Sequence, residues 1–218
     1  MAVYCAPGIK LPEDILDKLR DANAGRKKND FSWYARQLSD IFELDLSKSV
    51  TEKEMFFFAG FLTGEGSINV SAKKEKNSKF GIMLDPEFSA TQQVNGLSHL
   101  FIALRLFKTG SLRYKSGSNA TMVYRIDNRE SLKTKLIPFC ERYCSQYWSD
   151  AFQERLEIFK KLLEFFEEKA HLNFCDFSDK MLPLWSKMRK QEKQSNASFA
   201  SLEEAQAYAR HHYKKSKG

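Results

Sequence analysis

The sequence predicts an α+β fold whose element order from residue 52 is helix, two strands, helix, two strands and further helices. Two observations predict it. The apolar, helix-like segment 52–64 passes directly into apolar–polar alternation over residues 67–73. Two polar, turn-rich stretches, 74–79 and 116–119, each join a pair of alternating segments, as antiparallel hairpins require. Four antiparallel strands with helices packed on one face leave the other face of the sheet in water.

The composition is typical of a packed intracellular protein. The chain has 218 residues, of which 42% are hydrophobic, and its 18 phenylalanines are enough for a substantial core. The longest apolar run, 55–62, is far shorter than the roughly 20 residues of a membrane-spanning helix. The first residues lack the charged and then apolar pattern of a signal peptide, and the four cysteines form no paired framework. We therefore expect an intracellular protein with reduced thiols.

The first half of the chain is predicted to be three helices and a hairpin. Amphipathic periodicity indicates helices at 12–23 and 31–43. Thr51 is a suitable cap for the helix at 52–64, because its hydroxyl can accept a hydrogen bond from the first turn. The hairpin is expected to pair strands 67–73 and 80–92.

The second half repeats the strand pair and then becomes helical. The stretch Ser201-Leu-Glu-Glu204 is a capping box that predicts the start of the last helix. The expected elements are a helix at 95–107, strands at 110–115 and 120–127, helices at about 130–147, 150–169 and 176–193, a linker at 193–200 and a helix from 201.

Positive charge is concentrated in the part of the chain that contains the predicted strands. Residues 67–129 carry 10 Lys and Arg against 4 Asp and Glu, whereas residues 1–66 carry 9 against 11. An ordinary solvated surface would also account for a charge excess. Many cations on one exposed sheet face favour a polyanionic partner instead.

The helix at 52–64 contains a stripe of small residues. Gly60 and Gly64 are four residues apart on one face, flanked by Ala59 and Thr63. Glycine inside a helix costs about 1 kcal/mol relative to alanine, so the stripe is expected to allow close approach of another backbone. The same helix from a second copy is the expected partner, across a two-fold axis. The neighbouring apolar residues are expected to belong to the core: Phe56, Phe57, Phe58, Phe61 and Leu62.

Glu65 ends this helix where the helix dipole disfavours its charge. A two-fold axis beside the helix end would bring two copies of Glu65 together, and two such carboxylates require cations. Mg²⁺ commonly takes one or two protein carboxylates together with water and substrate phosphate. The plain alternative is a carboxylate that only solvates the helix terminus.

The stretch FAGFLTGEGS, residues 58–67, resembles the signature of the LAGLIDADG homing endonucleases. The predicted element order is similar to the αββαββα core of that family, and ATQQVNG resembles its strand end with a polar active-site residue. The segments SKFGIMLDPEF, KSGSNAT and QSNASF resemble the single-motif subgroup encoded in introns of organelle large-subunit ribosomal RNA genes. The resemblance implies a saddle-shaped four-stranded sheet. It also implies three segments: an N-terminal helical extension (1–50), the endonuclease core (51–170) and a basic C-terminal helical extension (171–218).

The resemblance implies the roles of individual residues. Glu65 falls on the metal-binding acid of the family, and Gly64 precedes it with a carbonyl that can join the same metal. Gln92 falls on the polar residue that positions the attacking water. Thr63 departs from the family, which often has an acid there. The basic residue that completes many family sites has three candidates here: Arg142, Arg155 and Lys160.

The exposed strand positions are the expected DNA contacts. Arg and Lys read guanine, and Asn and Gln read adenine, by paired hydrogen bonds in the major groove. Lysines in turns or at edges are expected to meet phosphates. The expected base-facing set is Asn69, Ser71, Lys73, Arg113, Lys115, Thr121 and Arg125, and the expected phosphate-facing set is Lys74, Lys76, Lys79 and Lys108. Asn119, in the turn between the last two strands, is a further expected DNA contact.

The resemblance implies a homodimer that hydrolyses one phosphodiester in each DNA strand. The implied cofactor is Mg²⁺ or another divalent cation such as Mn²⁺, and the implied products have short 3′ overhangs and promote intron mobility. The implied target is an intronless large-subunit rRNA gene in a chloroplast or mitochondrion, where the protein is expected to be encoded. The alternative is an RNA-splicing maturase of the same type, or a DNA-binding protein that does not cleave.

Three features are left open or excluded as sites. The N-terminal helices form either an extra layer or further DNA contacts through Arg26, Lys27 and Lys28. Cys140 and Cys144 are expected to be buried thiols, because no nearby residue completes a metal site. The two histidines His211 and His212 are expected to contact phosphate or to solvate a helix end.

Overall fold

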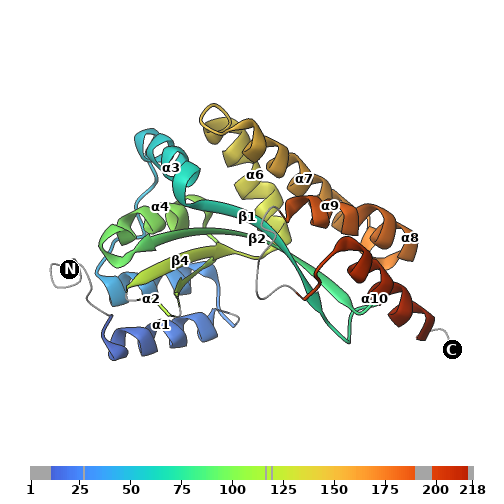
Figure 1. Cartoon of the computed structure of the whole chain (residues 1–218). Coiled ribbons are helices and arrows are strands. Elements are labelled where there is room, and N and C mark those ends of the chain that lie inside the picture. Colours follow the sequence, from blue (N-terminus) through green and yellow to red (C-terminus); the bar gives the residue numbers. More distant parts are fainter. Residues whose placement is uncertain (1–10, 27, 116, 119, 190–197, 216–218) are drawn as a thin grey trace. The chain divides into compact units, whose positions relative to one another are not determined.

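The computed structural model describes residues 11–26, 28–115, 117–118, 120–189 and 198–215 (Figure 1). The chain forms two compact units. One consists of residues 1–67 and 88–148, and the other of residues 68–87 and 149–218. These units divide the chain differently from the three predicted segments, because the N-terminal helices share a unit with the helix at 52–65.

The four strands form a single sheet in the order β1-β2-β4-β3. Its pairs β2–β4 and β3–β4 are antiparallel, with Phe88 opposite Ile126 and Ser111 opposite Arg125. This arrangement confirms the predicted α+β fold. The strands are β1 (Gly66–Lys74), β2 (Ile82–Gln93), β3 (Ser111–Tyr114) and β4 (Thr121–Ile126).

The first unit carries the helices of the chain from Glu13 to Cys144. Phe58 and Tyr124 are fully buried in its core, and the ring of Phe107 lies 6.2 Å from that of Phe58 and 6.4 Å from that of Tyr124. The helices of this unit are α1 (Glu13–Gly25), α2 (Phe31–Phe42), α3 (Glu52–Glu65), η2 (Val94–Gly96), α4 (Leu97–Phe107), α5 (Arg129–Ser131), η3 (Leu132–Leu136), α6 (Ile137–Phe139) and η4 (Cys140–Cys144).

The second unit contains the β1–β2 hairpin and the C-terminal helices. Phe159, Leu162, Met181 and Leu182 are fully buried there. Its helices are α7 (Asp150–Glu167), η5 (Ala170–Leu172), α8 (Phe174–Asp176), η6 (Phe177–Met181), α9 (Leu182–Met188) and α10 (Leu202–Lys215).

The predicted helices match the structure closely, except that the π-helical turns η3, η4 and η6 interrupt them. The turns η3 and η6 each end two residues before a proline, Pro138 or Pro183. Proline lacks the amide hydrogen that a regular helix needs. Most of the predicted linker lies outside the described residues, but Phe199 is buried and packs against the rings of Trp185 and Tyr208.

No helix within the described part of the chain combines the length and apolarity needed to cross a membrane.

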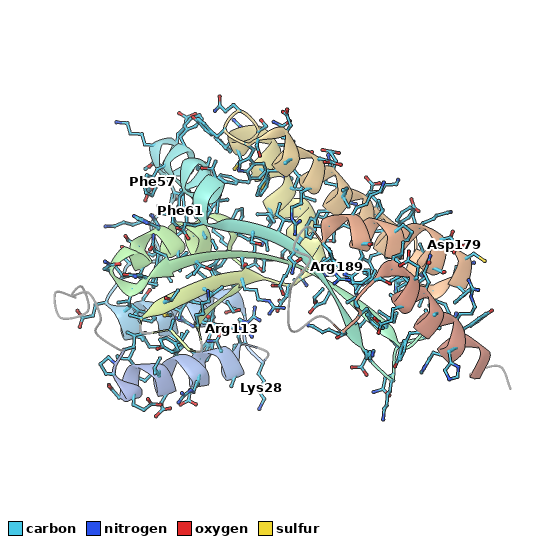
Figure 2. The ribbon with its side chains drawn as sticks, viewed as in Figure 1. Lys28, Phe57, Phe61, Arg113, Asp179 and Arg189 are labelled. Atoms are coloured by element: carbon cyan, nitrogen blue, oxygen red, sulfur yellow. The ribbon has the colours of Figure 1, made fainter. Side chains whose placement is uncertain are left out.

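The N-terminal helices form the extra layer that was one of the two predicted alternatives (Figure 1). They are tied to β3 and the residue before it by polar side chains. The guanidinium of Arg26 donates to the carbonyl of Gly110 at 3.0 Å, and the amide of Asn23 donates to the carbonyl of Leu112 at 2.9 Å. Lys27 lies outside the described residues, and Lys28 is exposed (Figure 2).

Replacing Tyr34 by Phe is expected to destabilise this layer. Tyr34 is fully buried, its hydroxyl accepts a hydrogen bond from the backbone N–H of Leu112 at 2.8 Å, and burial raises its pKa to about 12. Without the hydroxyl this buried N–H loses its partner, which typically costs about 1–3 kcal/mol. Chemical denaturation should show a lower unfolding midpoint for Tyr34→Phe than for Phe31→Leu at the half-buried start of α2. Equal midpoints would contradict this role.

Candidate active site and nucleic-acid-binding face

Helix α3 carries the predicted catalytic acid and is fixed at its start by a capping box. The Thr51 hydroxyl accepts from the Glu54 N–H, and the Glu54 carboxylate accepts from the Thr51 N–H at 2.8 Å and pairs with Arg105. The Thr51 N–H and Arg105 lower the pKa of Glu54 to about 2. The ionised carboxylate therefore stabilises the fold above its unfolded pKa of about 4, and this contribution is lost as the pH falls towards 2.

The end of α3 places Glu65 at the junction with β1. The N–H of Gly66 bonds to the carbonyl of Leu62, and β1 begins at Gly66 itself. A Cβ at Gly66 would lie 2.6 Å from that carbonyl oxygen, so only glycine allows the helix to pass directly into the strand. Glu65 is exposed at this junction.

The exposed face of α3 differs in part from the prediction. Gly60, Thr63 and Gly64 are exposed as expected, but Ala59, predicted to join them at the dimer interface, is fully buried within the chain. Ala59 lies on the inner face of the helix together with Phe58 and Leu62, which the structure places in the predicted core.

Phe56 and Phe57 were predicted to be core residues and are instead exposed. Their exposed fractions are 40% and 50%, among the largest for hydrophobic side chains in the described chain. Phe57 and Phe61 lie one turn apart on the same side of α3 (Figure 2). The helix therefore presents aromatic rings and bare glycines together on a face that the rest of its own unit covers only in part.

Packing within the chain does not require the glycines of this face. A Cβ built at Gly60 or at Gly64 meets no atom within 4 Å. By contrast, a Cβ at Gly110 would lie 2.7 Å from the carbonyl of Arg125, and the φ of +83° at Gly110 itself favours glycine. Gly60 and Gly64 thus leave open space beside α3 within the single chain.

Gln92, the predicted water-positioning residue, is held near the end of β2. Its Oε1 accepts from the N–H of Gln93 at 2.7 Å, and its Nε2 lies 3.5 Å from Nδ1 of His99. A Cβ at Gly96 would lie 2.7 Å from Cγ of Gln92, so the turn approaches this side chain closely.

His99 is a candidate site residue that sequence reasoning missed. Its ring lies 5.0 Å from that of Phe57 and 5.3 Å from that of Phe61, so it links Gln92 to the exposed face of α3. No sequence motif marks His99, because its contacts with Phe57 and Phe61 join two helices that are far apart along the chain. Its only local signal is a histidine in the first turn of the helix that follows Gln92.

The structure brings Glu65 and Gln92 to the same end of the sheet. Glu65 directly precedes β1 and Gln92 is the penultimate residue of β2. The two strands are neighbours joined by a tight connection, in which the N–H of Glu75 donates to the carbonyl of Gly81 at 2.9 Å. A hairpin places the start of its first strand beside the end of its second.

A divalent cation at this end of the sheet would have few protein ligands. Among the described residues there is no group of three or more His, Cys, Asp and Glu side chains able to hold a metal. Glu65 offers one exposed carboxylate, and the last turn of a helix offers carbonyl oxygens without intrahelical partners. These oxygen donors suit Mg²⁺, which retains water and binds substrate phosphate.

The three candidates for a basic site residue have different surroundings. Arg155 donates to the carbonyls of Ile68 at 2.7 Å and Met188 at 2.6 Å, and burial lowers its pKa. It therefore holds β1 against the end of α9. The guanidinium of Arg142 lies over the ring of the neighbouring Tyr143 at 5.2 Å, and Lys160 pairs with Glu157 at 3.2 Å on α7.

Polar side chains of β3 and β4 line one face of the sheet in the first unit, with Ser111 buried, Arg125 half-buried and Arg113 exposed. Arg113 lies opposite Val123, and Ser111 lies opposite Arg125, which in turn lies opposite Ser89 of β2. Arg113 is exposed, as Figure 2 shows, and its Nε donates to the hydroxyl of Ser111 at 3.2 Å.

The remaining predicted contacts of the first unit surround these residues. Arg125 lies 3.8 Å from Asp127, and Thr121 is half-buried opposite Gln93. Lys108 and Lys115 are exposed, and Asn119 lies outside the described residues.

The predicted contacts of the second unit lie on the β1–β2 hairpin and are partly engaged within the chain. Lys73 pairs with Asp85 at 2.6 Å, and Lys79 donates to the carbonyl of Leu172 at 2.8 Å. Lys76 is exposed, Asn69 and Ser71 are half-buried, and the ammonium of Lys74 lies over aromatic rings.

The predicted thiols are confirmed as buried. Cys140 and Cys144 are both fully buried, and burial and the hydrogen bond with Cys144 raise the pKa of the Cys140 thiol. A raised thiol pKa disfavours the reactive thiolate at Cys140, and burial places both cysteines in the core.

Comparison with known proteins shows that the chain is similar to endonucleases. The family described as LAGLIDADG endonuclease matches residues 58–163. The chain is 49% identical over 210 residues to DNA endonuclease I-CeuI of Chlamydomonas moewusii, covering 96% of this chain and 95% of that one. A solved structure of the group I intron-encoded homing endonuclease I-CeuI complexed with DNA has a TM-score of 0.88 at 48% identity, covering 94% of this chain and 99% of that one. The archaeal intron-encoded homing endonuclease I-Vdi141I, complexed with DNA, shares the fold at a TM-score of 0.64 and 23% identity, over 74% of this chain and 97% of that one.

Proposed function

Because this chain belongs to the LAGLIDADG homing endonuclease family, we propose that it cuts double-stranded DNA at a specific site as a homodimer. Each protomer hydrolyses one phosphodiester, so that the two cuts leave short 3′ overhangs. Hydrolysis of phosphodiester bonds in DNA is the activity of this family, and DNA is the ligand of the similar solved structure.

One observation carries the proposal: Glu65 lies at the end of a helix whose outer face has glycines that the chain itself does not need. The open space at Gly60 and Gly64 allows a second α3 to approach backbone to backbone. Scissile phosphates on opposite strands approach each other across the narrow minor groove. Two active sites reach both phosphates only if the helices that carry them nearly touch.

Glu65 and Gln92 carry out the hydrolysis of the phosphodiester bond. Endonucleases of this family are generally dependent on divalent metal, and here the Glu65 carboxylate and the Gly64 carbonyl would hold Mg²⁺ or Mn²⁺. A bound divalent ion supplies charge neutralisation at the phosphate and lowers the pKa of water. Gln92 orients the attacking water by hydrogen bonding. His99 fixes the Gln92 amide against the exposed rings of α3.

Polar side chains of the strands recognise the target DNA. Arg113 and Arg125 are suited to guanine, and Asn69 to adenine. Lys74, Lys76 and Lys79 are suited to phosphates, which set affinity and its dependence on salt.

The proposed target is an uninterrupted large-subunit rRNA gene of an organelle, in which the gene for this protein would lie within an intron. Purified protein with Mg²⁺ is expected to linearise a plasmid that carries this gene and to leave the same plasmid with the intron inserted uncut. Addition of EDTA should stop the reaction. Equal cutting of both plasmids would contradict site-specific homing.

A further inference from the structure

We propose that helix α10 is a positioning element for DNA binding, which holds the β1–β2 hairpin turn in place through Tyr208 and His212. The inference rests on the proposed function, because the turn carries lysines that are expected to meet DNA phosphates. All the residues concerned belong to the second unit, in which α10 lies beside the hairpin (Figure 1).

The turn contains one deeply buried side chain among polar ones. Residues 75–81 have the sequence EKNSKFG, and Phe80 within it is only 2% exposed. The ring of Phe80 lies 5.3 Å from that of Phe177, 5.5 Å from that of Phe174 and 5.7 Å from that of Tyr213 on α10. Phe80 therefore anchors the basic turn to the C-terminal helices.

The backbone of the turn meets α10 directly at Gly81. A Cβ there would lie 2.8 Å from Cγ of His212 and 2.9 Å from Cε1 of Tyr208, and its φ of +72° also favours glycine. Tyr208 and His212 are four residues apart on α10, and their rings are stacked with centroids 6.4 Å apart. The two rings thus form a support against which Gly81 packs.

The same support fixes a cation of the hairpin. The ammonium of Lys74 lies 5.3 Å from the centroid of the Tyr208 ring and 5.2 Å from that of Phe199. Such cation–π contacts are attractive and restrict a side chain that is otherwise flexible. Lys79, at the other side of the turn, is fixed by its bond to the carbonyl of Leu172.

Helix α10 is itself held firmly by the rest of the unit. Ala205 and Ala209 are fully buried on its inner side, and the amide of Gln206 donates to the carbonyl of Ser178 at 2.9 Å. Isolated two-stranded hairpins are at best marginally stable in water. A turn held in place before DNA binds avoids the entropic cost of ordering in the complex.

The test compares two neighbouring histidines of α10. His212 contacts the turn, whereas His211 is exposed, so His211→Ala is the matched control for His212→Ala. Tyr208→Leu removes the ring that supports Lys74, and Tyr208→Phe retains it. Hydrogen exchange of residues 75–81 in the DNA-free protein reports the order of the turn. Fluorescence anisotropy with a duplex spanning the cleavage site reports binding.

For His212→Ala and Tyr208→Leu we expect faster exchange of the turn and about tenfold weaker binding, which corresponds to about 1.4 kcal/mol. The cleavage rate at saturating DNA should stay unchanged, because Glu65 and Gln92 are untouched, so the effect appears in KM and not in kcat. Sequence preference should relax only at base pairs near the hairpin. In hydrogen exchange of residues 75–81, His211→Ala and Tyr208→Phe should behave as the unaltered chain.

Unchanged exchange in both His212→Ala and Tyr208→Leu would overturn the positioning role without reference to DNA. Faster exchange with unchanged affinity would overturn the link between the ordered turn and binding. Failure of the unaltered chain to bind the duplex would instead overturn the proposed function, while the exchange measurement would still report on α10.

Discussion

The Glu65→Gln protein is expected to bind its target DNA as tightly as the unaltered chain and to leave it uncut. Glutamine keeps the size of the side chain but lacks the charge that attracts a divalent cation. Charge neutralisation at the phosphate typically contributes several kcal/mol, and each 1.36 kcal/mol changes a rate tenfold. The cleavage rate should therefore fall by a factor on the order of a thousand or more. Glu65 is exposed and ends its helix, so the fold is expected to tolerate the change.

A gel-shift assay in Ca²⁺ and a plasmid-cleavage assay in Mg²⁺ separate binding from cutting. Glu52→Gln is the control, because Glu52 is an exposed acid in the first turn of the same helix. That variant should bind and cut normally. Cutting by Glu65→Gln at the rate of the control would remove Glu65 from the mechanism.

Local patterns in the sequence were sufficient to predict most of the fold. Strand β1 was expected at 67–73 and spans Gly66–Lys74, because strict alternation is a local signal. The end of α3 was expected beside Glu65 for the same kind of reason. A helix that gives way to alternation at a Gly-Glu-Gly must end there.

The surroundings of the site were less predictable, because apolar patterns do not tell which partner covers a side chain. Phe56 and Phe57 were expected in the core, yet Phe58 and Leu62 fill that face and leave the other two exposed. Ala59 was grouped with the glycines by size, although its position on the helix places it inward. The contact of Gln92 with His99 depends on how a strand end meets a helix, which no local pattern reports.

The contacts of the hairpin lysines with distant parts of the chain could not be predicted from the sequence either. Lys74 and Lys79 were expected to be equivalent phosphate contacts. In the structure Lys74 lies over the rings of Phe199 and Tyr208, whereas Lys79 binds a carbonyl of η5. These partners are more than 90 residues away along the chain, so local charge patterns carry no information about them.

Replacing Gly60 by Ala is expected to make the isolated protomer more stable and the dimer weaker. A Cβ at Gly60 meets nothing within 4 Å in the chain, so alanine brings its helix propensity without a clash. The gain is about 1 kcal/mol, or roughly 2–4 °C in Tm for a protein of this size. At a close helix–helix contact the added methyl group acts twice, once in each protomer, and overpacking costs about 1–3 kcal/mol per site. We therefore expect dimer affinity and DNA cleavage to fall at least tenfold, and further for Gly60→Leu.

Because Gly60→Ala is expected to raise the stability of the protomer and to lower the affinity of the dimer, it tests the α3 interface directly. Sedimentation over a range of concentrations measures dimerisation, and thermal unfolding below the dimerisation concentration measures the protomer. Glu154→Ala, an exposed site on α7, is the control that should leave dimerisation unchanged. A glycine that served only the fold of one chain would lower Tm when replaced and leave assembly intact. That result would place the dimer contact elsewhere. The glycines and Glu65 belong to the same helix, so without contact between the two α3 helices the two Glu65 carboxylates would lie apart.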